Sequence, residues 1–222
     1  MSNKKIERAL YGPSTAEVVL GAVIGIFLGA VLGAASLIVK PAELVREIPD
    51  EPVKGMVYVI QGARDVAGGR QGSAKRQAFL GGSGVSLTEA ELNATISSAM
   101  QSVSAAQGAS ATGGIFTPET PNLRIADGKL QIAVPTTMSV AGFSMPVLVV
   151  GRGGFRNRGG GFSFVTDEFQ IGSLNASQLP FLKGFVTSKL LAARPPAEDV
   201  AAAWAKLTNV TIDEDSLTLV TQ

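Results

Sequence analysis

Three arginines set among glycines are the residues whose types and spacing most suggest a specific chemistry in this sequence. Arg152, Arg156 and Arg158 lie in "VGRGGFRNRGGGF", together with two phenylalanines. Segments of this composition can bind RNA through cationic and stacking contacts. This segment is a single copy flanked by predicted strands, so we expect a hairpin tip with solvated arginines. Such a tip is suited to contact with anionic head groups or an anionic polymer.

The side chains that most enzymes use as nucleophiles, general bases or zinc ligands are missing. The 222 residues include no cysteine and no histidine, which excludes disulfides, Cys/His zinc sites and His-based triads. No G-x-S-x-G motif occurs, and the S-x-x-K spacing falls only at Ser2 to Lys5. Asp167 and Glu168 are expected on opposite faces of a strand, and "DED" at 213–215 is expected to be an acidic turn. We predict no catalytic, cofactor-binding or metal site, and a protein that is not an enzyme.

An uncharged apolar run lies near the start of the chain. It extends from Val18 to Val39, enough to cross a hydrocarbon core of about 30 Å at about 1.5 Å per residue. Ser14 and Glu17 have the spacing of a capping box, and Lys40-Pro41 follow the run. We predict a retained transmembrane helix over residues 14–39. The alternative is a cleaved signal peptide, whose apolar core would be shorter.

The charges on either side of this run predict its orientation. Lys4, Lys5 and Arg8 precede it, whereas "KPAELVREIPDEP" after it mixes basic and acidic residues. Because lysine and arginine favour the cytoplasmic side, we predict a cytoplasmic tail at 1–13. The remainder is then expected outside the cytoplasm, as a periplasmic domain of a single-pass inner-membrane protein.

Glycine recurs at every fourth position of the predicted transmembrane helix. Gly21, Gly25, Gly29 and Gly33 would form a shallow stripe along one side, where a second helix can approach closely. We therefore predict a helix-packing face for self-association or for another membrane protein. The alternative is that glycine is simply more frequent in membrane helices than in soluble ones.

The remaining residues predict a stalk followed by an α+β domain. Residues 40–55, punctuated by prolines, are expected to be a stalk, and 56–222 the domain. Asp127-Gly128, between alternating apolar residues, predicts a hairpin, and helices that pack on an antiparallel meander define the α+β class. Further expected elements are a strand at 56–63, a loop with a short helix at 74–80, a helix at 85–100 capped by Ser86 and Glu89, two strands around the arginine–glycine turn, helices at 176–192 and 197–207, and a terminal strand or hairpin at 208–220.

Three short segments of this domain are similar to a known kind of protein. "LTEAELNA" (87–94), "RIADGKLQI" (124–132) and "NVTIDEDSLTL" (209–219) resemble bacterial membrane-anchored envelope proteins of uncharacterised role. The resemblance implies an exported binding or assembly module rather than an enzyme, with a lipid-binding α+β fold among the folds expected.

Two functions follow from these features. The first is a non-enzymatic, membrane-anchored envelope protein whose exported domain binds an envelope component, with lipid among the candidates, or a protein partner. A lipid held between helices and sheet would place five apolar residues at the cavity: Phe143, Phe164, Leu182, Phe185 and Trp204. The alternative is an accessory subunit of a larger membrane assembly, docked through the glycine face. The net charge of +1 gives no reason to expect nucleic acid.

Overall fold

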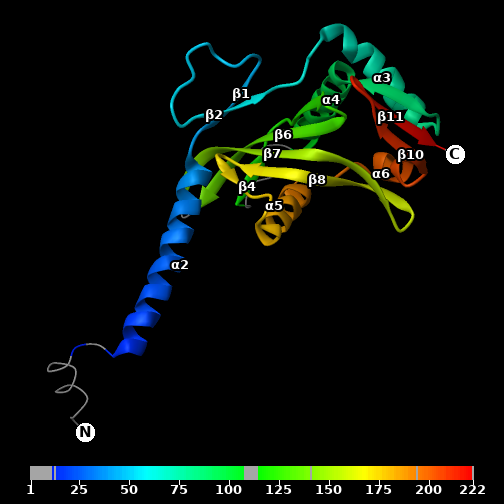
Figure 1. Cartoon of the computed structure of the whole chain (residues 1–222). Coiled ribbons are helices and arrows are strands. Elements are labelled where there is room, and N and C mark those ends of the chain that lie inside the picture. Colours follow the sequence, from blue (N-terminus) through cyan, green and yellow to red (C-terminus); the bar gives the residue numbers. More distant parts are fainter. Residues whose placement is uncertain (1–11, 13, 108–114, 141, 194, 222) are drawn as a thin grey trace. The chain divides into compact units, whose positions relative to one another are not determined.

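The computed structural model describes residues 12, 14–107, 115–140, 142–193 and 195–221, shown in Figure 1. The chain divides into two compact units, Met1–Ile38 and Val39–Gln222. The described elements comprise five helices and antiparallel sheets, so the predicted α+β class is confirmed.

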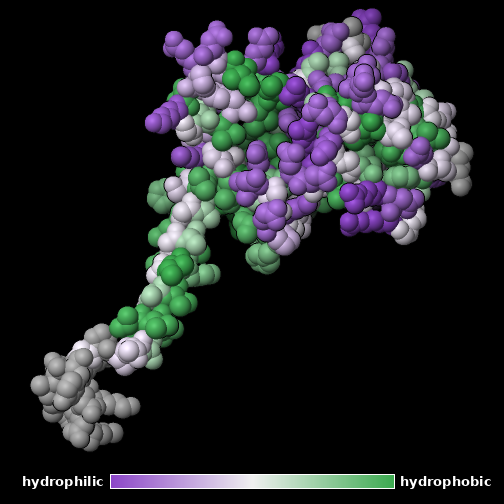
Figure 2. Space-filling view, viewed as in Figure 1, coloured by the Kyte–Doolittle hydropathy of each residue, from purple (hydrophilic) through white to green (hydrophobic). Residues whose placement is uncertain are grey.

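The first described helix, α2 (Thr15–Val39), has no buried residue. Its surface is largely hydrophobic in Figure 2, and it is long and apolar enough to cross a membrane, as a signal sequence also would be. The predicted capping box is present. The Ser14 N–H donates to Glu17 Oε2 at 3.0 Å, and the Glu17 N–H donates to Ser14 Oγ at 3.3 Å.

The largest sheet is built around two long hairpins. Its strand order is β4-β6-β7-β8-β9, and β5 pairs with the free part of β6. Asp127 and Gly128 both have positive φ, 53° and 64°, which forms the two-residue turn predicted between β5 and β6. The strands are β4 (Phe116–Pro118), β5 (Asn122–Ala126), β6 (Lys129–Val140), β7 (Phe143–Arg158), β8 (Gly161–Ile171) and β9 (Leu174–Asn175).

Both faces of this sheet are covered at its centre. Ala133, Leu148 and Val150 are buried with Val59, from the parallel pair β1 (Ala42–Val45) and β2 (Val57–Ile60). Ile132, Val134 and Val149 alternate with them along β6 and β7, and therefore belong to the opposite face. The expected stalk thus contains a strand of the domain, because Ala42 and Leu44 find apolar partners there.

A second, smaller sheet has the order β10-β11-β3, formed by β3 (Val85–Thr88), β10 (Leu207–Ile212) and β11 (Ser216–Thr221). It shares one core with the helices and with the turn end of β7 and β8. The Trp204 ring lies 5.5 Å from that of Phe155, and its Nε1–H donates to the Phe162 carbonyl at 2.7 Å. The buried members of this core are Phe79, Val85, Leu87, Leu92, Leu123, Ile125, Leu130, Ala203, Leu207, Val210, Leu217 and Leu219.

The remaining helices differ from expectation in two places. Residues 66–80, expected to be mostly loop, form α3 (Val66–Leu80), which packs on α4 (Glu89–Gln107). A Cβ on Gly72 of α3 would lie 2.8 Å from the Glu91 carbonyl oxygen, so glycine permits this close packing. The expected Ser86–Glu89 cap is also displaced, since Ser86 lies in β3 and the reciprocal cap joins Thr88 and Glu91. The last two helices are α5 (Pro180–Ala193) and α6 (Glu198–Trp204).

Candidate functional site

A pocket of about 730 Å³ lies on the face of the large sheet opposite to β1 and β2. Its walls come from β6, β7 and β8, from α5, from the end of α4 and from the segment around β4. Most of its lining residues are apolar: Met100, Pro118, Pro121, Ile132, Val134, Val149, Gly151, Phe164, Val165, Phe169, Leu190 and Leu191. The polar ones are Glu119, Arg158, Ser163, Thr166, Lys183 and Thr187.

Helix α5 forms one wall of this pocket because its start is fixed by local hydrogen bonds. The Ser177 N–H donates to Asn175 Oδ1 at 3.0 Å, and Pro180 occupies the first helical position, where no N–H is needed. Val186 is 1% exposed and anchors the helix. Lys183, Thr187 and Leu190 follow one another at intervals of four and three residues, which places them on one face, along the pocket.

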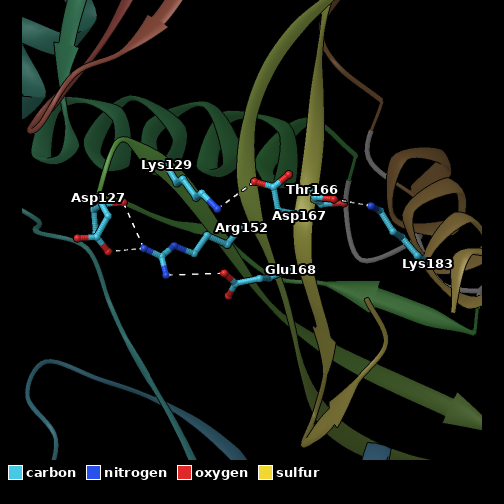
Figure 3. Close-up of polar contacts among 8 residues, drawn as sticks. Asp127, Lys129, Arg152, Thr166, Asp167, Glu168 and Lys183 are labelled. Carbon is cyan, nitrogen blue, oxygen red and sulfur yellow. Dashed lines mark hydrogen bonds and ion pairs between the residues drawn. The ribbon is translucent and has the colours of Figure 1, made fainter. Parts of the chain in front are cut away.

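The polar groups of the pocket meet at β8. Lys183 Nζ donates to the Thr166 carbonyl oxygen at 2.7 Å (Figure 3). The Thr166 hydroxyl is buried and has no hydrogen-bond partner among the described residues. A buried hydroxyl without a partner lowers the stability of the folded protein. The site therefore offers mainly apolar walls and the Lys183 ammonium, with Glu119, Arg158, Ser163 and Thr187 as further polar side chains.

A row of ion pairs lies on the neighbouring part of the sheet. Arg152 pairs with Asp127 and reaches Glu168 at 4.0 Å, while Lys129 Nζ lies 3.0 Å from Asp167 Oδ2 (Figure 3). The hydrogen bond and the charge of Lys129 lower the pKa of the Asp167 carboxyl below its ordinary value. Each carboxylate thus faces a cation, so the two do not form a paired acid–base site.

The three predicted arginines occupy different environments along β7. Arg152 is held in the ion pairs just described, at the point where the register shifts beside Gly153. Arg156 lies close enough to Asp167 to help lower its pKa. Arg158, at the end of β7, lines the pocket. Their contact with an anionic surface stays a prediction.

Buried polar side chains at the start of α4 tie the domain together. The Asn93 amide donates to the carbonyls of Ala63 and Leu123 at 2.9 and 2.7 Å, and its oxygen accepts the Leu123 N–H at 2.7 Å. Glu89 accepts the backbone N–H groups of Ala63 and Ile125. Asn93 and Glu89 of α4 thus bind the segment after β2 and strand β5, and their role is structural.

Glu91 is the buried carboxylate of this region, at 3% exposure. Burial by itself raises its pKa. Hydrogen bonds from Lys75 at 2.7 Å and from the Thr88 N–H at 2.9 Å, together with the lysine charge, outweigh burial and hold the pKa below the ordinary 4.5. The ionised form therefore stabilises the folded state.

We predict that stability falls in acid through this group. A folded pKa below the unfolded value gives a contribution that is present above about pH 4.5 and is lost as the pH falls through the folded pKa. Glu91→Gln should flatten this part of the dependence of thermal unfolding on pH. Lys75→Met removes two of the causes that lower the folded pKa, so it should make this loss smaller. Equal pH profiles for the wild type and Glu91→Gln would contradict the assignment.

The other residues singled out in the sequence are the glycines of α2 and the acidic segment 213–215. A Cβ on Gly21, Gly25, Gly29 or Gly33 would meet no atom within 4 Å, so the helix-packing face stays a prediction. The acidic 213–215 segment forms the turn between β10 and β11, where the Asp213 N–H donates to the Ser216 carbonyl. Within the described part of the chain, no group of three or more metal-ligating side chains occurs.

Of the five residues expected at a cavity, Phe164 alone lines the pocket. Trp204 belongs to the core, and Phe143 and Phe185 are exposed, at 74% and 37%. Sequence reasoning missed Lys183 and Val149. A signal for Val149 was present, because Val147 to Val150 is an unbroken apolar run, and such runs indicate a strand covered on both faces.

Comparison of the chain with protein-family models, curated proteins and solved structures found no significant match. The resemblance to membrane-anchored envelope proteins therefore stays a prediction.

Proposed function

We propose that this protein is a non-enzymatic, membrane-anchored protein whose domain binds an amphiphile with an acyl chain and an anionic head group. The pocket under α5 carries the proposal, because its walls are mainly apolar and its polar groups include the Lys183 ammonium. The acyl chain of the ligand would lie against Val134, Val149 and Phe169. The head group would replace the Thr166 carbonyl as the partner of Lys183.

The dimensions and energetics of the pocket support this ligand class. Its volume of about 730 Å³ falls within the range of about 300–1,000 Å³ that is common for small-molecule sites. Each methylene removed from water contributes about 0.8 kcal/mol, so an acyl chain gains more from these walls than a polar metabolite would. An anionic head group suits the Lys183 ammonium, whose hydrogen-bond partner is the neutral Thr166 carbonyl and whose charge also acts on Asp167.

The finer location belongs to the same proposal. Lys4, Lys5 and Arg8 before α2 favour a cytoplasmic N-terminus, which supports a domain outside the cytoplasm, at the inner membrane. A binding domain joined to such a helix would hold or present its ligand at the bilayer surface. The alternative, an accessory subunit docked through the glycines of α2, is supported by their regular four-residue spacing.

Photolabelling with a fatty acid that carries a diazirine on its alkyl chain tests the pocket. The full chain is reconstituted in phosphatidylcholine nanodiscs, labelled and digested. We expect labelled peptides from β8 and α5. Thr187→Trp places an indole in the pocket. We expect the indole to displace two methylene groups of the acyl chain from the pocket. At about 0.8 kcal/mol for each methylene group, labelling should fall about tenfold.

Ser188→Trp provides the matched control, since Ser188 is exposed on the next position of α5 and is not a lining residue. It should leave the labelling of β8 unchanged. Equal labelling of β8 in the two variants, or labels confined to α2, would refute the pocket as the binding site.

A further inference from the structure

Large apolar side chains are exposed together at one end of the large sheet. Phe143, at the β6–β7 turn, is 74% exposed, and Val140 opposite it is 48% exposed. Ile115 lies beside them, since its carbonyl accepts the Ser139 N–H at 2.9 Å, and it is 43% exposed. Three neighbouring exposed residues of this size differ from the single apolar residues scattered over most surfaces.

Exposed apolar side chains also occur on α5. Phe181 is 86% exposed, the highest value among the described large hydrophobic residues, and Leu191, which also lines the pocket, is 57% exposed. α5 packs on β4, which begins directly after Ile115. We call Ile115, Val140, Phe143, Phe181 and Leu191 together the apolar rim.

The strands and the helix that carry most of the apolar rim are poor in acidic residues. The sequence contains no acidic residue between Asp127 and Asp167, and none between Glu168 and Glu198. These two stretches include β6, β7 and α5, whose basic residues include Lys183 and Lys189. Glu119, after β4, is the acidic residue on the adjoining segment, and it lines the pocket. A basic apolar surface matches an anionic lipid surface.

The covalent chain keeps the domain near the end of α2. Only Lys40 and Pro41 separate Val39, the last residue of α2, from Ala42, the first residue of β1. Three residue steps span at most about 11 Å of extended chain. With α2 in a bilayer, a domain tied this closely has lipid within reach of its surface.

We propose that the apolar rim inserts into the interfacial layer of the bilayer that holds α2, with anionic lipid as its partner. Among the described residues, Phe143 and Phe181 are the two most exposed aromatic side chains and would enter deepest. Lys189 would face the phosphate groups. This proposal depends on α2 as a membrane anchor and does not depend on the ligand of the pocket.

Spin labelling of the full chain measures the insertion directly. The chain has no cysteine, so Phe143→Cys and Phe181→Cys each introduce one labelling site. Val220→Cys is the control, because Val220 is apolar and 40% exposed but lies in β11 of the small sheet. Each variant is placed, one chain per disc, in nanodiscs of phosphatidylcholine and phosphatidylglycerol.

The labels at 143 and 181 should become more accessible to oxygen than to a water-soluble nickel complex, and the label at 220 should show the reverse. Removing phosphatidylglycerol should shift the first two labels towards water. Nickel accessibility at 143 and 181 equal to that at 220 would overturn the proposal. Protection from both reagents, seen only with two chains per disc, would identify a second copy as the partner and would also overturn it.

The pocket and the apolar rim can fail separately. Thr187→Trp in the same discs should reduce photolabelling of β8 about tenfold and leave the accessibility at 143 and 181 unchanged.

Discussion

Gly62→Ala should lower the free energy of unfolding of the domain by about 4 kcal/mol or more, among the largest effects of a single methyl group. The added Cβ would lie 1.7 Å from the Leu123 carbonyl oxygen, 2.8 Å from its carbonyl carbon and 3.0 Å from Asn93 Nδ2. Leu123 cannot move away easily, because β5 is held in register on β6 and its N–H is bonded to Asn93. The clash therefore falls on backbone that is fixed from two sides.

Thermal unfolding of the full chain in detergent micelles, followed by circular dichroism, measures this effect. Gly154→Ala is the control, since a Cβ on Gly154 of β7 would meet no atom within 4 Å. The control should change the unfolding temperature little. Similar unfolding temperatures for both variants would show that Gly62, two residues after β2, is not packed on β5 as described.

Lys183→Glu should weaken binding of an anionic amphiphile by about 10- to 100-fold, as expected for loss of a hydrogen bond to a charged group. Lys183 Nζ reaches β8 from α5 and lies at the pocket, 2.7 Å from the Thr166 carbonyl. A glutamate would place a negative charge beside the head group and would also remove the donor. The loss should be smaller for the corresponding long-chain alcohol, which has no charge to repel.

Competition between unlabelled fatty acid or alcohol and the diazirine fatty acid measures the two affinities. Lys189→Glu is the matched control. It makes the same charge change on the same helix, but Lys189 is exposed, lies 5.7 Å from the Phe185 ring and is not a lining residue. An equal loss of affinity in both variants would indicate a general charge effect instead of a head-group contact.

Features encoded by neighbouring residues were predictable from the sequence. The Asp127-Gly128 turn, the Ser14–Glu17 cap and the apolar run of α2 each depend on residues close in the chain, and all three occur as expected. The α+β class followed because the alternation in β5 and β6 is local too.

Features that depend on distant partners were not predictable. α3 contains three glycines and reads as a loop, yet its glycines fit against α4, whose position no local pattern reveals. β3 and α4 read as one helix, because Ser86 and Leu87 become a strand only by pairing with Thr218 and Leu217. The pocket was not predictable for the same reason, since Lys183 and Thr166 are 17 positions apart in sequence.

The short connection between α2 and β1 has a mechanical consequence. Proline has a fixed φ of about −65°, so Lys40 and Pro41 leave few dihedral angles able to turn. β1 in turn is hydrogen-bonded to β2 and packed against the large sheet. Tension along the chain at α2 would therefore load the hydrogen bonds between β1 and β2 after three residue steps, with no long linker before them.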